Sequence, residues 1–483
     1  MFIGLDIGTS SVKAILLGDD QSLLAAATSE LTVERPHPGW SEQDPDSWWS
    51  ACETVLDELK ERFPAELAAV RGIGLSGHMH GATLLDADGK PLRPCILWND
   101  GRSARQCAEL EAAEPKFLTL GGNLVMPGFT APKLQWVREN EPDIFARTAK
   151  VLLPKDYVRF RLTGDYVGDM SDSAGTLWMD VARRDWSDEL LAATGLTRDH
   201  MPRLVEGSEA SGNVKPDLCA RWGFRTAPVV AGGGGDNAAS ACGVGAVDPG
   251  SAFVSLGTSG VLFVTNDRFS PNVGGAVHAF CHAVPGTWHQ MGVMLSATDC
   301  LNWLARTLKS TPGELTSALT SVAGPSPVSF LPYLGGERTP HNDVDIRAAF
   351  AGIAHETDAA VLTHAVLDGV AFALKDCLEV LSVAGTRVDR ILAVGGGSRS
   401  LLWLEIIASL LNVTVDVPVD GDFGASLGAA RLGQAAALGT TDGIFTKPAL
   451  KASIDPVPGL IEPYAEGYGR WRKLYSALKQ AGF

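Results

Sequence analysis

Residues 5–12 read Leu5-Asp6-Ile7-Gly8-Thr9-Ser10-Ser11-Val12, and a similar run, Val254-Ser255-Leu256-Gly257-Thr258-Ser259-Gly260-Val261, occurs in the second half of the chain. In both runs an apolar segment ends in a Gly-Thr-Ser turn, and a second apolar segment follows. This pattern predicts a strand, a tight turn and a second strand. The likeness is short, but it indicates two related α/β units that each carry one such hairpin.

The segments that follow the first hairpin alternate between strand and helix patterns. We expect strands over 2–6, 12–17, 24–33, 70–76 and 82–86, and helices that start at Pro45 or cover 133–140 and 154–162. Asp44 is placed to cap the helix at Pro45, because a carboxylate before the first turn accepts its free N–H groups.

The second half repeats this alternation. A polar stretch, 205–227, precedes a strand over 228–231, a glycine turn and a small-residue helix from Ala238. Beyond it we expect strands over 252–256, 261–264, 390–394 and 413–417, and helices over 401–411 and 424–437. The fold class is therefore α/β. We place the domain boundary near the glycine turn, which predicts units of 1–240 and 241–483.

Length and charge restrict the classes of protein. The chain has 483 residues, 45% of them hydrophobic, and a net charge of −16. Such a composition fits folded domains with sizeable cores and excludes a disordered chain. The negative charge argues against a nucleic-acid partner, which needs clustered Lys and Arg. It leaves open a small phosphorylated ligand, because backbone N–H groups and a metal ion hold such ligands with few basic side chains.

The cysteines and the apolar segments indicate in which cellular compartment the protein lies. Eight cysteines are scattered with no C-x-x-C pair, which predicts reduced, mostly buried thiols. The first residues make a poor signal peptide, and we expect no segment that spans a membrane. We therefore expect a cytoplasmic protein.

The two Gly-Thr-Ser hairpins are suited to phosphate binding. Glycine lets the backbone approach a ligand, and the N–H and hydroxyl groups donate to phosphate oxygens. Asp6 precedes the first turn, where its carboxylate can hold Mg²⁺ through water, and Lys13 can meet phosphate charge from the other strand. The alternative is a pair of ordinary tight hairpins.

A second candidate lies at Gly232-Gly233-Gly234-Gly235-Asp236-Asn237. Here a strand ends, the glycines are expected to leave room for a ligand, and Asp236 stands at the start of a helix. Ligands of α/β folds bind at the carboxyl ends of strands, and a carboxylate there can take a proton from a substrate hydroxyl. The alternative is that Asp236 is only the N-cap of the helix.

Three further features are less specific. Residues 395–400, Gly395-Gly396-Gly397-Ser398-Arg399-Ser400, form a glycine turn suited to a nucleotide base or ribose. His78 and His80 would face one way in a strand, but no third metal ligand accompanies them. Trp98 can pack on a sugar while Asp100 and Arg102 bond its hydroxyls, although an aromatic anchor beside a surface ion pair is the favoured interpretation. Residues 72–77 match G-x-G-x-x-G, yet they read as a strand and not as a dinucleotide site.

Together these motifs resemble the FGGY carbohydrate kinases. The resemblance rests on Asp6-Ile-Gly-Thr9-Ser10, Gly257-Thr258-Ser259, Gly-Gly-Asp236-Asn237 and Gly396-Gly397, and on Gly128-Phe-Thr130-Ala-Pro-Lys133-Leu-Gln-Trp136, which is similar to the first family signature. Segments 35–45, 78–83, 96–102, 153–157 and 336–340 are similar to the branch that phosphorylates the ketopentose D-xylulose. Val361 departs from the second signature, where a polar residue is expected.

The resemblance implies two actin-like (ribonuclease H-like) domains around a deep cleft, with ATP, Mg²⁺ and a sugar as ligands. It implies that Asp236 is the general base and that Asp6 lies near Mg²⁺ and the γ-phosphate. The sugar contacts that it implies are Met79, His80, Asn237 and, more weakly, Trp98. The phosphate and adenosine contacts that it implies are Thr9, Ser10, Lys13, Gly257, Thr258, Gly396, Gly397 and Ser400, although many relatives carry Asn in place of Ser400.

Two alternatives stay open at this point. One is a kinase of the same family that acts on another pentulose, a pentitol or a polyol. The other is an actin-like ATPase with a chaperone or filament role, which would turn over ATP without sugar. We expect no nucleic-acid or membrane partner, and a homodimer is possible by resemblance alone.

Overall fold

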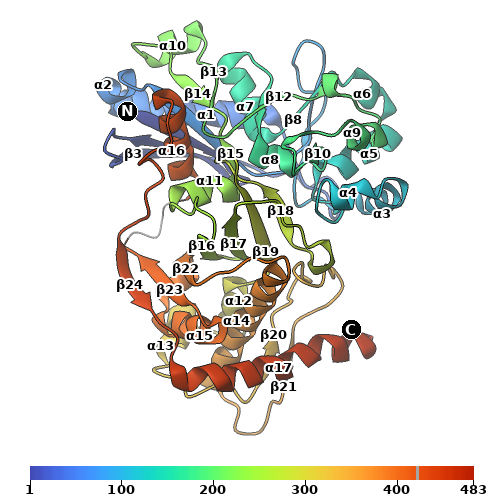
Figure 1. Cartoon of the computed structure of the whole chain (residues 1–483), viewed down its shortest axis with the longest axis vertical. Coiled ribbons are helices and arrows are strands. Elements are labelled where there is room, and N and C mark those ends of the chain that lie inside the picture. Colours follow the sequence, from blue (N-terminus) through green and yellow to red (C-terminus); the bar gives the residue numbers. More distant parts are fainter. Residues whose placement is uncertain (420–423, 483) are drawn as a thin grey trace.

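The computed structural model describes residues 1–419 and 424–482, and its strands build two large mixed sheets with helices packed on them (Figure 1). The first sheet has the order β13 (Ala210–Asn213), β14 (Val229–Ala231), β5 (Gly72–Gly77), β1 (Phe2–Ile7), β2 (Ser11–Leu17) and β3 (Leu23–Glu30), with β15 (Gly234–Gly235) beside β5. The second has the order β18 (His278–Cys281), β19 (Trp288–Met294), β17 (Gly260–Asn266), β16 (Ala252–Leu256), β22 (Arg390–Val394), β23 (Thr414–Pro418) and β24 (Leu450–Ile454).

The two sheets repeat one pattern of strand pairing. β1 and β2 form an antiparallel hairpin in which Asp6 lies opposite Lys13, and β5 runs parallel to β1 on the other side. β16 and β17 form the second antiparallel hairpin, with β22 parallel to β16. Both hairpins are therefore where the repeated sequence predicts them, each in the middle of its own sheet.

The first sheet buries a different set of side chains on each face. Ile3, Leu5 and Ile7 pack in one cluster with Trp48 and Cys52 of α1 (Pro45–Arg62). Asp44 caps this helix as predicted, and its side chain accepts the N–H of Asp46. α7 (Pro154–Thr163) and α10 (Pro216–Trp222) contribute to the same cluster. Period-two alternation along β1 therefore sends Phe2 to the opposite face.

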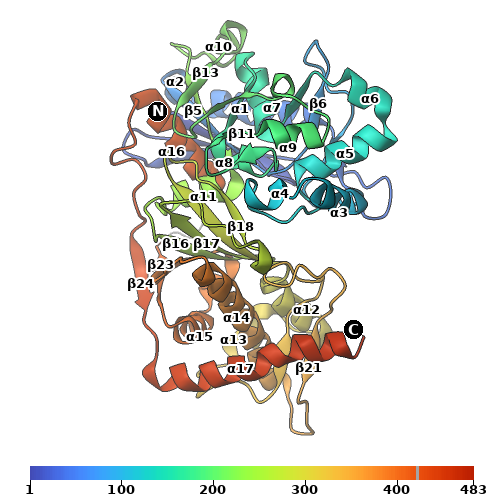
Figure 2. The ribbon, with the colours of Figure 1, turned by 45° about the vertical axis from the view of Figure 1, so that its right-hand side comes forward.

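That opposite face is covered by a helix from far along the chain. α16 (Ala425–Leu438) lies against β1 and β5 of the first sheet (Figures 1 and 2). In the chain it stands between β23 and β24, which both belong to the second sheet. A Cβ on Gly4 would stand 1.9 Å from the main-chain oxygen of Ser426, and one on Gly74 would stand 1.8 Å from that of Ala429. The contact is thus backbone against backbone, which small residues on both partners permit.

This crossing bears on the domain division. Residue 240 lies within α11 (Asp236–Gly243), which packs beside α16. The units of 1–240 and 241–483 stay a prediction, and the first sheet is covered on one face by a helix of the second unit.

The second sheet carries a helical layer of α12 (Thr298–Leu308), α14 (Ala359–Val383), α15 (Leu401–Leu411) and α17 (Pro458–Gln480). α14 and α15 bury most of their surface, which agrees with the apolar sequence of 401–411.

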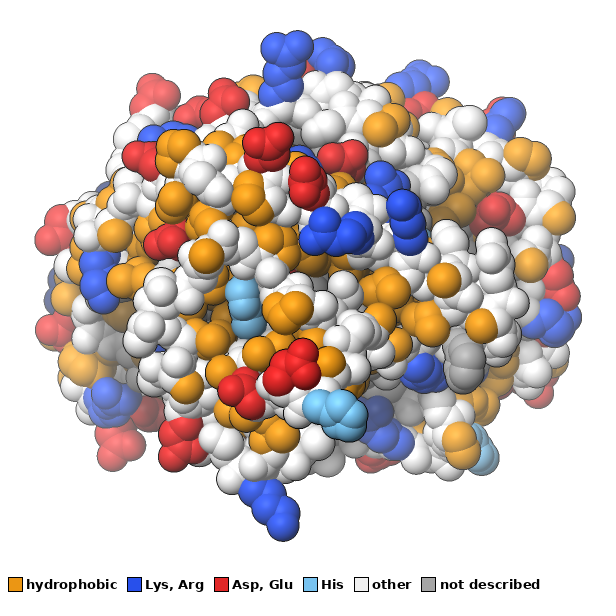
Figure 3. All heavy atoms as spheres, turned by 90° about the horizontal axis from the view of Figure 1, so that it is seen from below, with side chains coloured by type: hydrophobic (Ala, Val, Ile, Leu, Met, Phe, Trp, Pro, Cys, Tyr) orange, Lys and Arg blue, Asp and Glu red, His pale blue; other side chains and the backbone are white. Residues whose placement is uncertain are grey.

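Seen from below, charged side chains of both signs are scattered among apolar ones over the end of the molecule (Figure 3). None of the helices in the described residues is long and apolar enough to cross a bilayer.

The remaining elements form small sheets and helices around these layers. They are β4 (Glu42–Gln43), α2 (Pro64–Ala68), β6 (Thr83–Leu85), β7 (Cys95–Ile96), α3 (Ala104–Ala113), α4 (Lys116–Thr119), α5 (Thr130–Asn140), α6 (Pro142–Arg147), β8 (Lys150–Leu152), β9 (Val167–Asp169), α8 (Met170–Ala174), β10 (Met179–Asp180), β11 (Asp185–Trp186), α9 (Asp188–Ala193), β12 (Arg203–Val205), α13 (Pro312–Ser317), β20 (Ser329–Leu331) and β21 (Ala349–Ala351). All eight cysteines are free, and seven are buried, as their distribution predicts.

Candidate active site

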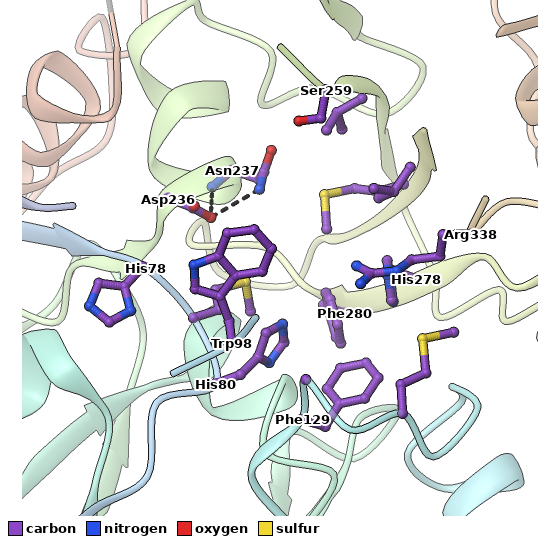
Figure 4. A pocket seen from close by; sticks show the side chains of 16 residues that line it. His78, His80, Trp98, Phe129, Asp236, Asn237, Ser259, His278, Phe280 and Arg338 are labelled. Atoms are coloured by element: carbon purple, nitrogen blue, oxygen red, sulfur yellow. Dashed lines mark hydrogen bonds between the residues drawn. The ribbon is translucent and has the colours of Figure 1, made fainter. Parts of the chain in front are cut away.

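A cavity of about 230 Å³ lies between the two halves of the chain. It is smaller than the roughly 300–1,000 Å³ of sites for drug-sized ligands, so it suits a small molecule. The first half contributes His78, Met79, His80, Trp98, Met126, Gly128, Phe129, Asp236 and Asn237, and the second half contributes Ser259, Val261, His278, Phe280, Met291, Val293 and Arg338. Asp236 and Asn237 lie toward one side of the cavity, and Arg338 and His278 toward the other (Figure 4).

Asp236 is the first residue of α11, and the N-cap position belongs to Gly235. The interpretation of Asp236 as a simple N-cap is therefore wrong. Its Oδ1 accepts hydrogen bonds from the Asn237 main-chain N at 2.7 Å and from Asn237 Nδ2 at 2.9 Å. Since both bonds go to Oδ1, the Oδ2 atom is left to accept a proton or hydrogen bond from a ligand.

The electrostatic surroundings make Asp236 a better base than a solvated aspartate. Burial and, to a smaller extent, the negative charge of Asp6 raise its pKa to about 6, against the opposing effect of the Asn237 hydrogen bonds. Burial also raises the pKa of Asp6, against a hydrogen bond with Ser76 and the charge of Lys13. A base with a pKa near 6 is ionised at neutral pH and still has appreciable proton affinity.

The glycines before Asp236 serve close packing, which corrects the expectation that they leave room for a ligand. A Cβ on Gly232 would stand 2.1 Å from the Glu206 main-chain oxygen, and one on Gly233 would stand 2.3 Å from that of Leu75. Gly233 also has a φ of +76°, a conformation that side chains disfavour. Met79 fills the space beside Gly235. Glycine is required here because protein atoms occupy the volume.

A buried network of charges holds this loop from behind. Arg159 donates a hydrogen bond from Nη2 to the Gly232 main-chain oxygen, and the Gly235 main-chain N donates to Ser171 Oγ at 3.2 Å. Ser171 in turn donates to Asp169, whose carboxylate lies 2.6 Å from Lys155 Nζ. These side chains are almost fully buried. The sequence analysis did not find them; their only signal was the charged residues within the predicted helix 154–162.

Met79 and His80 line the cavity as the resemblance implies. His80 follows the end of β5 with a φ of +72°, and its Nδ1 lies 2.7 Å from the Gly175 main-chain oxygen. Burial lowers the pKa of His80 to about 3, so its ring is neutral. The expectation that His78 and His80 face one way from a strand is wrong, because β5 ends at Gly77 and the chain turns at His80.

Trp98 connects the cavity to the first hairpin. Its side chain is 40% exposed, and its Nε1 donates a hydrogen bond to Thr9 Oγ1 at 3.1 Å. Asp100 and Arg102 form an ion pair at 2.7 Å, but both side chains are buried and neither lines the cavity. The predicted ion pair is therefore present, whereas its predicted place on the surface is wrong, because Arg102 lies over the ring of Trp40.

The first hairpin lies close to Asp236. Gly8 closes the turn with a hydrogen bond from its main-chain N to the Ser11 oxygen at 3.0 Å, and Ser10 is exposed. Lys13 is half-buried, and its charge lowers the pKa of Asp6. The structure thus pairs Asp6 with Lys13 in the first hairpin and brings the Asp6 charge near Asp236. Their contact with phosphate stays a prediction.

The second hairpin meets the glycine turn of residues 395–397. The main-chain oxygens of Gly257 and Thr258 accept hydrogen bonds from Thr298 and Ala297 at 2.9 and 2.8 Å, which anchors the turn to α12. A Cβ on Gly397 would stand 2.8 Å from that of Leu256, at the base of the hairpin, whereas one on Gly396 would meet open space. Ser400 caps α15 by accepting the N–H of Trp403. Contacts of these residues with a nucleotide stay predictions.

The metal prediction rests on Asp6 alone. In residues 1–419 and 424–482, no three His, Cys, Asp or Glu side chains gather in a way that could hold a metal ion. A second carboxylate lies near it, because the charge of Asp6 raises the pKa of Asp236. Mg²⁺ takes one or two protein carboxylates together with water and phosphate oxygens, so the residues present fit it.

Among the cavity residues of the second half, only Ser259 belongs to a motif that the sequence indicates, the Gly257-Thr258-Ser259 turn. The others could not be assigned a role from the sequence. Arg338 lies within segment 336–340, which supported the resemblance, but no spacing or periodicity pointed to its side chain. His278, Phe280 and Met291 come from a segment for which no element and no motif was predicted. Only the pairing of β18 with β19 brings them to the cavity.

Comparison with known proteins agrees with this geometry. Residues 1–243 match the model of the N-terminal domain of the FGGY family of carbohydrate kinases, and residues 252–437 match that of its C-terminal domain. The fold is accordingly the actin-like, ribonuclease H-like arrangement of two α/β domains.

Individual relatives are similar over nearly their whole length. A xylulose kinase of Escherichia coli (strain K12) is 51% identical over 90% of both chains, and a xylulose kinase of Klebsiella pneumoniae is 47% identical over 99% of both. The crystal structure of a xyloylose kinase from Brucella ovis is 56% identical, covers 99% of both chains and superposes with a TM-score of 0.97. The hairpins, the carboxylate between them and these matches lead to one conclusion: the chain belongs to the FGGY family of carbohydrate kinases.

Proposed function

We propose that the protein transfers the γ-phosphoryl group of ATP to the C5 hydroxyl of D-xylulose and so forms D-xylulose 5-phosphate. The observation that carries this proposal is Asp236, a carboxylate with a pKa of about 6 in a small cavity between the two phosphate-type hairpins. The similarity to xylulose kinases along nearly the full chain supports the choice of sugar.

Asp236 acts as the general base in this reaction. Its Oδ1 is held by two hydrogen bonds from Asn237, so Oδ2 accepts the hydrogen bond of the substrate hydroxyl and then its proton. The charge network behind the glycine loop keeps this carboxylate in place. Orientation of the hydroxyl toward the phosphorus is the main catalytic contribution, because phosphoryl transfer needs positioning more than covalent chemistry.

The hairpins hold the phosphate groups of ATP. The Thr9 and Ser10 hydroxyls, Gly257, Thr258 and the Lys13 ammonium supply donors, and Gly396, Gly397 and Ser400 lie on the adenosine side. Asp6 would hold Mg²⁺, which when bound neutralises phosphate charge. The apolar walls of the cavity, which include Phe129 and Phe280, exclude water that would otherwise compete as acceptor.

We also propose where the reaction takes place. Eight free cysteines are consistent with the reducing cytoplasm as the place of the reaction. A homodimer stays a prediction from the family.

An ADP-release assay across sugars tests the proposed function. ADP release should be highest with D-xylulose among pentuloses, pentitols and glycerol. Another preferred acceptor would assign the chain to a different kinase of this family, and equal release without sugar would favour an ATPase role and overturn the proposal.

A matched pair of variants tests the base. Asp236→Ala should lower kcat by about 10²–10⁴-fold, the usual contribution of a general base, with an unchanged fold by circular dichroism. Asp217→Ala is the control, because Asp217 is exposed on α10 and distant in sequence from the cavity residues. Near-normal turnover of Asp236→Ala would remove Asp236 from the mechanism.

A further inference from the structure

The wall of the cavity opposite Asp236 carries a charged side chain without an assigned role. Arg338 lies in the loop between β20 and β21, and its guanidinium points into the cavity beside His278 (Figure 4). Its main-chain N donates a hydrogen bond to Glu337 Oε1 at 2.7 Å. Within the part of the chain that the structure describes, the guanidinium itself has neither an ion-pair partner nor a hydrogen-bond acceptor.

This arrangement leaves the guanidinium available to a ligand. Partial burial lowers the pKa of Arg338, and the charge of Glu337 opposes this effect. Burial lowers the pKa of His278, and the charge of Arg338 lowers it further. The guanidinium therefore lies near the His278 imidazole, which offers it no negative charge. A guanidinium has five N–H donors and no acceptor. Arg338 is only half-buried and lines the cavity, so its donors are open to a ligand that enters there.

The backbone presents Arg338 to the cavity in a fixed position. The Thr339 main-chain N donates to the Val293 oxygen at 3.0 Å, and Val293 N donates back to Thr339 Oγ1 at 3.0 Å. Directly after the end of β19, the Leu295 main-chain N donates to Glu337 Oε1 at 2.9 Å. Val293 itself lines the cavity. The residues on both sides of Arg338 are thus bonded to the chain that forms the cavity wall.

We propose that Arg338 is a substrate-binding and specificity-determining residue whose guanidinium donates hydrogen bonds to the carbonyl end of a ketose. The inference rests on the proposed function, which places the hydroxyl to be phosphorylated at Asp236. Asp236 and Arg338 line different sides of the one cavity, so a short sugar chain bound at Asp236 extends toward Arg338 (Figure 4).

The chemistry of the guanidinium selects a carbonyl over a hydroxyl. A ketone oxygen only accepts hydrogen bonds and therefore matches a group that only donates. The hydroxyl of a pentitol at this position can also accept, but it brings a proton that needs its own acceptor. The guanidinium cannot take that proton, because it has donors only. Arg338 should therefore favour the ketose over the corresponding pentitol.

The test compares D-xylulose with xylitol, which differs at the carbonyl carbon. For Arg338→Met, we expect kcat/KM for D-xylulose to fall about 10–100-fold, the range for a hydrogen bond to a charged group, mainly through KM. The corresponding loss with xylitol, or in its inhibition constant if turnover is too slow, should be below about threefold. The KM for ATP should stay within about twofold. Arg306→Met, on the exposed side of α12, is the control and should match the wild type.

Two outcomes in a folded Arg338→Met variant would overturn this role for Arg338. One is an unchanged KM for D-xylulose, and the other is an equal loss of kcat/KM for D-xylulose and xylitol. If Arg338→Met does not fold, Arg338→Lys decides: its single ammonium cannot make the paired contact of a guanidinium, so ketose preference should fall, and an unchanged preference rejects the role. A wild-type enzyme that phosphorylates no ketopentose would instead reject the proposed function.

Discussion

Lys133 donates a hydrogen bond from Nζ to the main-chain oxygen of His80 at 2.9 Å. The same Nζ donates to the Gly128 main-chain oxygen at 2.8 Å, so one buried side chain connects two parts of the cavity wall. His80 has a positive φ, a conformation that costs a residue with a side chain about 1 kcal/mol or more. Lys133 therefore stabilises the turn that directs His80 toward the cavity.

Lys133→Met should impair sugar binding more than nucleotide binding. The change removes the Lys133 donor from the Gly128 oxygen, at a cost of roughly 1–3 kcal/mol, and leaves the His80 oxygen with the Thr130 hydroxyl alone, at 3.2 Å, which loosens the turn at His80. We expect the KM for the sugar to rise about tenfold or more while the KM for ATP stays within about twofold. Initial-rate kinetics measure both. Lys473→Met, on the exposed side of α17, serves as the control; equal increases in both KM values would argue against a specific role at His80.

The pH dependence of the reaction should follow Asp236. Its pKa is about 6, and the base must be ionised, so kcat/KM should fall about tenfold per pH unit below 6 and be level between about 7 and 8. His80 does not produce this limb, because its pKa is about 3. Rates measured from pH 5 to 8 give the midpoint. A midpoint above about 7, or one that Asp6→Asn fails to move to lower pH, would contradict the assignment.

Asp236→Asn should stabilise the protein while it abolishes activity. The folded-state pKa of Asp236 lies above its usual 3.8, so between these values the folded state binds more protons than the unfolded state. Stability therefore falls as pH rises from about 4 to 6, and the full penalty is present above 6. At pH 8 we expect the variant to gain about 2–4 °C in Tm, with the gain shrinking as pH falls below 6.

Asp217→Asn is the matched control for that measurement, because Asp217 is exposed and its carboxylate has no charged partner in the described residues. Its Tm should stay within about 1 °C of the wild type at both pH values. A lower Tm for Asp236→Asn at pH 8 would show that the ionised carboxylate stabilises the fold, in contrast to the present explanation.

A pair of glycine substitutions tests the contact of α16 with the first sheet. The Cβ of Gly74→Ala would overlap the Ala429 main-chain oxygen at 1.8 Å, so α16 must shift, and the free energy of unfolding should fall by roughly 3 kcal/mol or more. Gly313→Ala, in α13, meets no atom within 4 Å and should stabilise by about 0.5–1 kcal/mol. Urea unfolding measures both. A Gly74→Ala variant as stable as the wild type would show that α16 does not pack on β5 in this way.

Local chemistry explains which parts of the fold were predictable. The hairpins of Asp6 and Ser255 follow from turn residues between apolar runs, and the strand predicted over 70–76 is present as β5 (Gly72–Gly77). The place of Asp236 follows because ligand-binding residues of α/β folds stand after strands. Each of these predictions depends on residues within about ten positions of one another.

The missing parts depend on residues far apart in the chain. Arg338 reaches the cavity because its loop is bonded to β19, and nothing within segment 336–340 shows that pairing. Residue 4 must be glycine because the main-chain oxygen of Ser426, more than 400 positions later, occupies the place of a Cβ. The glycines of residues 232–235 were interpreted as ligand space because a sequence does not show that Glu206 and Leu75 fill it. Pattern reasoning finds a site but not the atoms that surround it.

The position of α16 also has a consequence for synthesis on the ribosome. The strands β1 and β5 and the helix α11 are complete once Gly243 has left the ribosome, but the helix that covers them ends at Leu438. At roughly 5–20 residues per second, the nearly 200 residues between them take about 10–40 s to make. During that interval α16 does not yet cover this face of the nascent sheet, and a chaperone or a transient contact must shield it until the last eighth of the chain arrives.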